Sequence, residues 1–248
     1  MIRHNPLRPL FWLCALALLF YGATEASAAD RAPLRWQAVL VAGDDSQPVF
    51  DNAVEAFTRW LSAHGAAADD IHRLSAAAGP RHPGSQPASA SAVLQTIASL
   101  HPQAGEGCLV FVTSHGQHGE GVWLAYTGEF LRPAALAQAL SKGCGKAPTI
   151  VVISACYSGS FAAGKMRAPN RIILTAARPD RPSFGCQADR TYTVFDECLL
   201  GALPNAASWR GLREASLSCV REREHEMEVL PSQPQAFFGA AARNLRLR

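Results

Sequence analysis

Short apolar runs alternate along the chain with segments in which apolar residues recur at helical spacing. The short runs predict buried strands over residues 36–42, 71–76, 109–112, 122–126, 149–155 and 171–177. The helical spacing predicts helices over residues 50–65, 92–101, 133–143, 192–203 and 209–227. Residues 77–91 are rich in Pro, Gly and Ser and predict a mobile surface loop. Such alternation favours an α/β fold, a three-layer sandwich with a mainly parallel central sheet.

The length of the chain indicates a full domain, and its charge bears on which partners it can have. The chain has 248 residues, 48% of them hydrophobic, so it can bury the core of a full domain. Its formal charge of +3, from 23 basic and 20 acidic residues, is too close to neutral to indicate a nucleic acid or an anionic membrane as a partner.

Residues 1–28 have the pattern of a secretory signal peptide. Basic residues precede an apolar run, Leu10 to Tyr21, and small residues follow at 26–28. The run is shorter than the roughly 20 residues that span a bilayer, which favours cleavage over a retained anchor. We expect an exported protein, periplasmic or secreted, with one domain over residues 35–245; membrane anchoring by an uncleaved signal is the alternative.

Two predicted strands end next to a reactive side chain. His115 follows the run over 109–112, and Cys156 follows the run over 149–155. Because the carboxyl ends of parallel strands share one edge of a sheet, neighbouring strands would bring this imidazole and thiol together. A single Cys after a strand is usually a small buried residue, and a single loop His is usually solvated, which is how we interpret His118. As a pair, His115 and Cys156 indicate nucleophilic catalysis by a histidine-activated thiol.

The glycine after His115 also has a use in this chemistry. Gly116 allows the backbone to turn so that its N–H points at a developing oxyanion. The N–H of Cys156 is the second candidate donor.

The two motifs resemble those of a known family. "TSHG" and "SACYSGSF" are similar to the His-Gly and Ala-Cys-x-Ser-Gly motifs of legumain-type cysteine peptidases. "AVLVAG" and "ILTAARPDRPSFGC" are further matches, and "PSQPQAFFG" resembles bacterial members. The resemblance covers about Trp36 to Gly239. It implies a caspase-haemoglobinase fold, a catalytic dyad of His115 and Cys156, and cleavage or transfer at a peptide bond.

The resemblance also points to a specificity pocket, where this chain departs from the asparagine-specific pattern. The acidic position two before the catalytic cysteine is the neutral Ser154, the later aspartate is kept as Asp196, and Asp51 stands where the family has arginine. We expect a basic P1 side chain, paired by Asp196 and, as a second candidate, Asp51. Alternatively, Asp51 caps the helix that follows it. Asn52 is the candidate for the asparagine that orients the histidine in the family.

The segment "RPSFGC" has a counterpart that contacts substrate in the family. Ser183, Phe184 and Gly185 are therefore candidates to supply main-chain groups to an extended peptide. An ordinary surface turn led by Pro182 is the alternative.

Six cysteines follow the signal peptide, and an exported protein meets an oxidising compartment. Cys108 and Cys144 precede the two strands that end at the site, so a disulfide between them is reasonable if those strands are adjacent. Cys198 and Cys219, on successive predicted helices, are the second candidate pair. Cys156 and Cys186 would then remain thiols.

The motif survey indicates no cofactor. The sequence contains no Cys-x-x-Cys, no His-Glu-x-x-His and no glycine-rich phosphate loop, so no metal site is predicted. We expect a cysteine endopeptidase that acts on peptides or proteins through a thioester. A transpeptidase or transamidase with the same dyad, and a non-catalytic peptide-binding relative, are the alternatives. Oligomeric state is not indicated.

Overall fold

The computed structural model describes residues 1–2, 34–79 and 82–247. The predicted signal peptide, residues 1–28, lies outside these residues apart from its first two. All the elements below belong to the unit that begins at Pro33.

A seven-stranded sheet forms the centre of the fold. In spatial order its strands are β10 (Gln235–Phe238), β9 (Arg171–Thr175), β8 (Thr149–Ser154), β4 (Glu106–Thr113), β1 (Arg35–Ala42), β2 (Ile71–Ser75) and β3 (Ser85–Pro87). All neighbouring pairs are parallel except β9 and β10. The predicted mainly parallel α/β sheet is confirmed.

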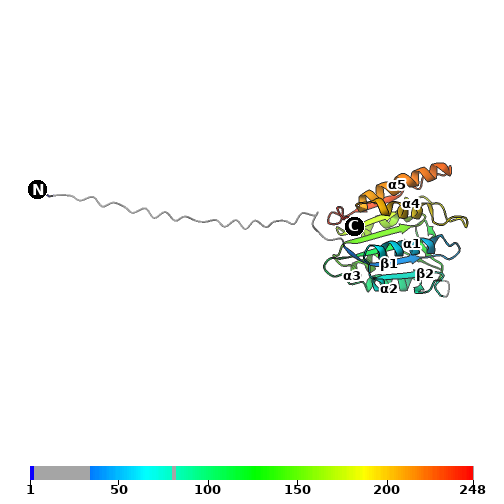
Figure 1. Cartoon of the computed structure of the whole chain (residues 1–248), viewed down its shortest axis with the longest axis horizontal. Helices are drawn as coiled ribbons and strands as arrows, with labels where there is room; N and C mark the ends of the chain where they lie inside the picture. Colours follow the sequence, from blue (N-terminus) through cyan, green and yellow to red (C-terminus); the bar gives the residue numbers. More distant parts are fainter. Residues whose placement is uncertain (3–33, 80–81, 248) are drawn as a thin grey trace. The chain divides into compact units, whose positions relative to one another are not determined.

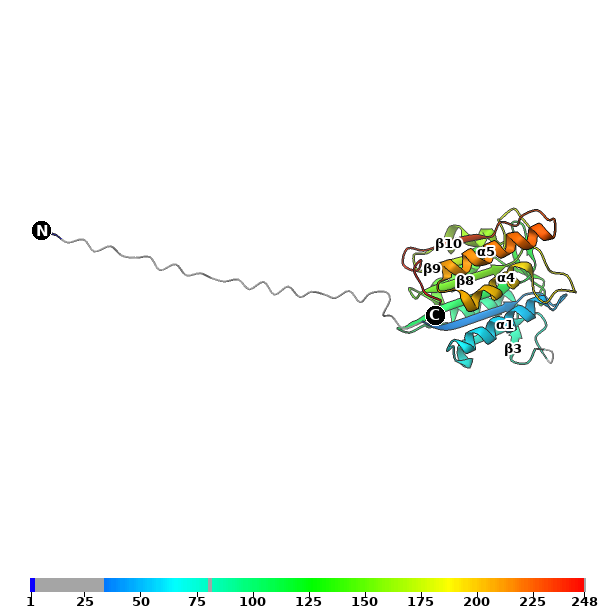
Figure 2. The ribbon, with the colours of Figure 1, turned by 45° about the horizontal axis from the view of Figure 1, so that its top comes forward.

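Helices cover both faces of this sheet (Figures 1 and 2). They are α1 (Val49–Ala63), α2 (Ala90–Ala98), α3 (Pro133–Gly143), α4 (Val194–Ala202) and α5 (Trp209–Glu226). Side chains of α1, α4 and α5 pack with one alternate set of strand residues, such as Phe111, and those of α2 and α3 pack with the other, such as Val110. The strands are buried on both faces, which explains their nearly continuous apolar runs.

A small antiparallel sheet follows β4 in the chain. It consists of β5 (Gly116–Gln117), β6 (Gly121–Leu124) and β7 (Glu129–Leu131). Short 3-10 turns occur at Ala68–Asp70, Ser158–Ala162, Gly164–Met166 and Leu203–Asn205.

Four short strands, β3, β5, β7 and β10, were missed in the sequence. The prediction of an irregular loop over residues 77–91 was wrong in part, because Ser85–Pro87 pair with β2 as the edge strand β3. Proline is compatible with an edge position, where one side of the strand needs no partner. Of the other missed strands, β5 and β7 pair with β6, and β10 pairs with β9.

Capping side chains set the helix starts that the sequence pattern left uncertain. The Ser89 hydroxyl accepts from the Ala92 amide, so α2 begins at Ala90, two residues earlier than predicted. The Thr193 hydroxyl accepts from the Asp196 amide, so α4 begins at Val194. Both are ordinary N-terminal caps.

The two expected disulfides are present. Cys108 in β4 is bonded to Cys144, which follows α3, and Cys198 in α4 is bonded to Cys219 in α5. Disulfides are characteristic of extracellular and other oxidising compartments.

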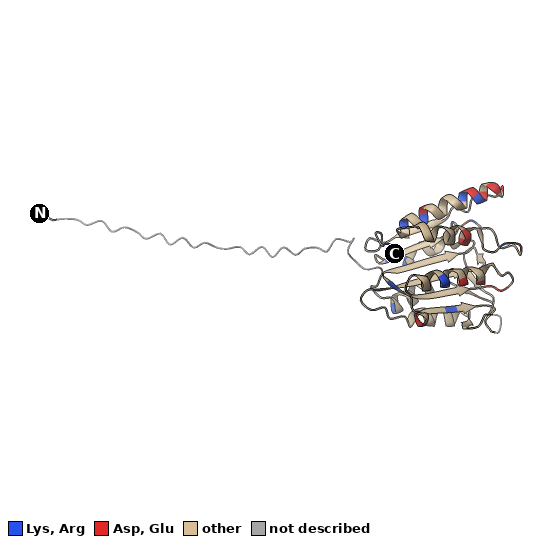
Figure 3. Ribbon diagram, viewed as in Figure 1, with Lys and Arg blue, Asp and Glu red and all other residues tan. Residues whose placement is uncertain are grey.

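Charged side chains lie mainly on the helices and loops. Figure 3 shows charges of both signs along α5, whereas most of the sheet is uncharged. None of the helices in the described ranges has the length and apolar character needed to cross a bilayer.

Candidate active site

The carboxyl ends of β4 and β8 lie side by side at one edge of the sheet. The two strands are parallel, and their ladder of paired residues ends at Thr113 and Ser154. His115 and Cys156 each follow two residues later, so the register brings them to the same level. The structure thus places the predicted histidine and cysteine segments together.

Gly116 packs directly on the main chain of Cys156. A Cβ at Gly116 would lie 2.0 Å from the carbonyl oxygen of Cys156 and 3.1 Å from its nitrogen. The φ of Gly116 is outside the left-handed region, so the turn itself does not require glycine. The reason for glycine here is space: a side chain would push the histidine segment away from the cysteine segment.

The Cys156 sulfur is a free, half-buried thiol held against Ser183. The Ser183 amide and hydroxyl lie 3.3 and 3.8 Å from the sulfur, and the thiol lies 3.5 Å from the Ser183 carbonyl oxygen. The next residue, Tyr157, has φ 57°, a left-handed conformation that is uncommon for a bulky side chain. Its amide donates to the Arg181 carbonyl at 2.8 Å. The segment 181–183 therefore fixes the chain on both sides of the thiol.

The predicted substrate segment has a conformation that depends on glycine. Gly185 has φ 98°, and a Cβ there would lie 2.5 Å from the Val194 nitrogen. The Val194 amide donates to the Phe184 carbonyl at 3.0 Å. The structure brings Ser183 against the thiol and anchors Phe184 and Gly185 to the start of α4.

Two arginines attach the same loop to the segment between α5 and β10. The Arg178 amide donates to the Ser232 carbonyl at 2.9 Å, and its guanidinium donates to the Gln233 side chain. The Arg181 guanidinium donates to the Pro231 carbonyl at 3.1 Å. This wall of the site is therefore tied to a distant part of the chain.

The His115 imidazole has a carboxylate neighbour that the sequence did not suggest. Its Nε2 lies 3.9 Å from Oδ1 of Asp44, which is buried. The Phe50 ring packs edge-on against the imidazole, with ring centroids 5.3 Å apart. The Asn52 amide, expected to orient the histidine, instead donates to the Thr191 carbonyl. His118 is exposed, and its ring lies edge-on to Tyr157.

Asp196 is fully buried below this edge of the sheet. The Thr113 hydroxyl donates to its Oδ2 at 2.7 Å. Burial raises the pKa of this carboxyl to about 6, although hydrogen bonds from Thr113, Ser154 and Thr193 lower it. Oδ1 has no hydrogen-bond partner among the residues described. Ser154 therefore belongs to the same site as Asp196, where its hydroxyl solvates the carboxylate.

Asp51 lies among a different set of charges. It is in the first turn of α1, whose N-cap residue, Pro48, makes no side-chain capping hydrogen bond. Its Oδ2 is 3.5 Å from Nε2 of His82. Burial raises the pKa of this carboxyl, opposed by a hydrogen bond with Ser75 and by His82. Asp51 and Asp196 thus have different neighbours: Ser75 and His82 lie next to Asp51, and three hydroxyls surround Asp196.

The second free thiol, Cys186, is close to the site but poorly reactive. Burial, followed by the negative charges of Cys156, Asp196 and Asp44, raises the pKa of Cys186 to about 12. A thiol with such a pKa is almost never ionised near neutral pH. Cys156 is the better nucleophile on these grounds.

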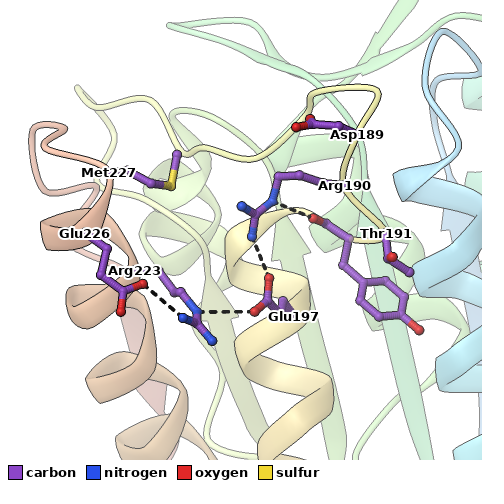
Figure 4. A pocket seen from close by; sticks show the side chains of 8 residues that line it. Asp189, Arg190, Thr191, Glu197, Arg223, Glu226 and Met227 are labelled. Atoms are coloured by element: carbon purple, nitrogen blue, oxygen red, sulfur yellow. Dashed lines mark hydrogen bonds and ion pairs between the residues drawn. The ribbon is translucent and has the colours of Figure 1, made fainter.

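A pocket of about 570 Å³ lies beyond this wall, between residues 189–192 and the helices α4 and α5. Figure 4 shows Arg190 and Arg223 both reaching Glu197, at 2.5 and 3.3 Å. Arg223 also pairs with Glu226 at 2.9 Å. These pairs fasten the loop that follows Gly185 to both helices. Within the described ranges, no group of three or more His, Cys, Asp or Glu side chains is arranged to hold a metal ion.

Comparisons with known proteins agree with this arrangement. The profile of the Peptidase C13 family matches residues 90–217, a range that contains His115, Cys156 and Asp196. Among solved structures, caspase-1 from Spodoptera frugiperda superposes with a TM-score of 0.60 at 14% sequence identity, covering 83% of this chain and 86% of that one. A search of curated proteins finds no match. The structural likeness shows a caspase-like fold.

Proposed function

The chain belongs to the Peptidase C13 family of cysteine peptidases, and we propose that it is an exported endopeptidase in which Cys156 and His115 form the catalytic dyad. The observation that carries the proposal is the contact between the two motifs. Gly116 packs on the main chain of Cys156, and the sulfur beside it is a free thiol. An imidazole and an ionisable thiol at one edge of a sheet are what acyl transfer through a thioester needs.

The chemical steps follow from these groups. The Cys156 thiol gives its proton to His115, and the sulfur attacks the carbonyl carbon of the P1 residue, whose oxygen takes up the displaced electron pair. The N–H groups of Gly116 and Cys156 are the donors proposed for that oxyanion. The carbon–nitrogen bond then breaks, and the leaving amine takes the proton from His115. Water cleaves the thioester and regenerates the thiol.

Substrate main chain is proposed to lie along Ser183–Gly185. An extended peptide gains hydrogen bonds from exposed main-chain groups with little side-chain selectivity. Ser183 touches the sulfur, so a peptide bound there has its scissile carbonyl within reach of Cys156.

For the P1 side chain we propose a basic residue paired by Asp196. The carboxylate is surrounded by hydroxyls of Thr113, Ser154 and Thr193, and one of its oxygens has no hydrogen-bond partner among the described residues. An arginine or lysine head group is the partner that would satisfy it. The case for Asp51 as a second pocket residue is weaker, because its neighbours are Ser75 and His82.

The dyad is tested by labelling with a thiol-directed peptide electrophile. The wild-type protein should be labelled at Cys156, C156A should not be labelled, and H115A should be labelled at least about tenfold more slowly. Labelling that is slow in the wild-type protein and indifferent to His115 would favour a peptide-binding relative without activity.

Fluorogenic peptides that differ only at P1 test the pocket. We expect arginine or lysine at P1 to be cleaved faster than asparagine, and Asp196→Asn to remove that preference. Faster cleavage after asparagine would reject the basic pocket while leaving the dyad intact. Product masses in the presence of an added amine distinguish hydrolysis from transfer.

A further inference from the structure

His115 has one carboxylate neighbour whose position is determined by the sheet itself. The ladder between β1 and β4 ends with Ala42 opposite Thr113. Continuing that register by two residues places Asp44 opposite His115. The residue between, Gly43, has no room for a side chain, because a Cβ would lie 2.6 Å from the Trp123 carbonyl oxygen and 2.7 Å from Cβ of Ser114.

The main chain on either side of Asp44 and His115 is held by hydrogen bonds. The Gly43 amide donates to the Thr113 carbonyl at 2.9 Å, and the Gly43 carbonyl accepts from the Ala125 amide at 2.8 Å. The His115 carbonyl accepts from the Trp123 amide at 2.9 Å. Both residues therefore extend from backbone that is fixed by its neighbours.

The carboxylate of Asp44 is also fixed. Its residue is 6% exposed, and Oδ1 accepts from both the amide and the hydroxyl of Ser46. The same oxygen is 3.9 Å from Nε2 of His115. That separation is longer than a direct hydrogen bond, but catalytic hydrogen bonds often shorten only when substrate is bound.

On these grounds we propose that Asp44 is the positioning residue for His115. This inference rests on the proposed dyad of His115 and Cys156. With Nε2 directed at Asp44, the other ring nitrogen, Nδ1, is the one assigned to exchange the proton with the Cys156 thiol. The Asp44 carboxylate orients the ring and stabilises the positive charge that His115 carries between taking the thiol proton and giving it to the leaving amine.

Asp44→Asn is the main test, with Asp45→Asn as its matched control. The asparagine keeps the shape of Asp44 and an oxygen that accepts from Ser46 but removes the negative charge. Asp45 is exposed, so its variant removes the same charge one residue away. We expect D44N to lower kcat by at least about tenfold with KM changed less than about twofold. D45N should leave both constants within about twofold.

A double-mutant cycle with His115 separates positioning from a structural or substrate-binding role. The readout is the rate at which iodoacetamide alkylates Cys156, mapped by mass spectrometry, which requires no peptide substrate. D44N should slow alkylation several-fold in the wild-type background and have no further effect in H115A. Equal slowing in both backgrounds, or an unchanged kcat in D44N, overturns the proposal.

The two readouts also separate this proposal from the proposed function. A wild-type protein that cleaves no peptide but shows the coupling between Asp44 and His115 contradicts the peptidase assignment and supports the positioning role. Peptide cleavage without the coupling does the opposite. If D44N does not fold, Ser46→Ala replaces it: that variant keeps the charge but removes one hydroxyl that holds it, and kcat should fall about two- to fivefold. An unchanged kcat in S46A would then overturn the proposal.

Discussion

The strands β4 and β8 run side by side and differ sharply at their two ends. Near the amino ends, Cys108 is joined to Cys144 by a disulfide, and both residues are buried. At the carboxyl ends, His115 and Cys156 are half exposed, and Cys156 is a free thiol. The amino end is cross-linked by a disulfide and is called the closed end below. The carboxyl end, called the open end, has an accessible imidazole and thiol.

The open end also contains the features that cost folding free energy. Asp196 is a buried carboxyl with a raised pKa, and Tyr157 has a left-handed backbone. Such features are typical of sites in which strain or desolvation serves chemistry, and the rest of the fold must offset them. The amino ends of β4 and β8 therefore contribute stability, and the reactive groups are confined to their carboxyl ends.

Gly116→Ala should have the largest effect, because it disrupts the open end directly. The new Cβ would lie 2.0 Å from the Cys156 carbonyl oxygen, so the two segments must separate. We expect kcat/KM to fall about 100-fold, as for other small displacements of catalytic groups. The free energy of unfolding should fall by about 1–3 kcal/mol. Peptide cleavage and denaturant unfolding measure the two effects.

The matched control is Gly201→Ala in α4, where nothing lies within 4 Å of the added Cβ. It should be neutral or stabilise by up to about 1 kcal/mol, since alanine is the better helix former. Full activity in G116A would mean that the close approach of the two segments is not needed for catalysis.

Removing the disulfide at the closed end should lower stability without abolishing activity. Cys108 and Cys144 are 36 residues apart, and closing such a loop is worth roughly 4 kcal/mol in the chain-entropy description. The double variant C108A/C144A should lose about that much by denaturant unfolding and keep kcat within about twofold at 25 °C. Loss of catalysis in a folded variant would show that the two ends are not independent.

The second disulfide provides a comparison for the expected loss of stability. Cys198 and Cys219 are 21 residues apart, so C198A/C219A should lose about 0.5 kcal/mol less than the first pair. A much larger loss would point to packing between α4 and α5 rather than to loop closure.

Asp196→Asn should change how stability depends on pH. In the folded protein burial raises the pKa of Asp196 from its ordinary value of 3.8 to about 6, so the folded state holds this proton more tightly than the unfolded state. Below about pH 4 both states are protonated and the carboxyl costs nothing. As the pH rises to about 6 the wild-type protein loses up to about 3 kcal/mol that the asparagine variant keeps.

Denaturant unfolding of both proteins at several pH values between 4 and 7 measures that difference. A stability gap between wild type and D196N that stays constant over this range would contradict the raised pKa. A wild-type protein that gains stability relative to D196N as the pH rises would indicate a lowered pKa for Asp196 instead.

The elements that carry the site were predictable because their signals are local. The apolar runs before His115 and Cys156 mark buried strands, and the glycines and cysteines at their ends are visible in the sequence. The disulfide between Cys108 and Cys144 followed from the expectation that those two strands are neighbours, and the structure confirms it.

What the sequence did not reveal depends on spatial relations between separate elements. Asp44 meets His115 through the register of β1 against β4, which no local pattern encodes. Asp51 was a candidate for the specificity pocket, but in the structure its neighbours are Ser75 and His82. β10 is only four residues long, and its partner β9 lies 60 residues earlier, from Gln235 to Thr175. Amino-acid composition does not identify which of several strands pairs with a short segment so far away in the sequence.

The order of the cysteines has a consequence for how the protein acquires its covalent bonds. Within the described ranges, both disulfides join cysteines that are consecutive along the chain, and the two free thiols lie between the pairs. If the chain is exported as proposed, a thiol oxidase acting on it as it emerges from a translocation channel would meet Cys108 and Cys144 before the cysteines that follow them. Joining each cysteine to the next available one then produces the first native bond before Cys156 appears, which keeps the proposed nucleophile from being trapped by an earlier thiol.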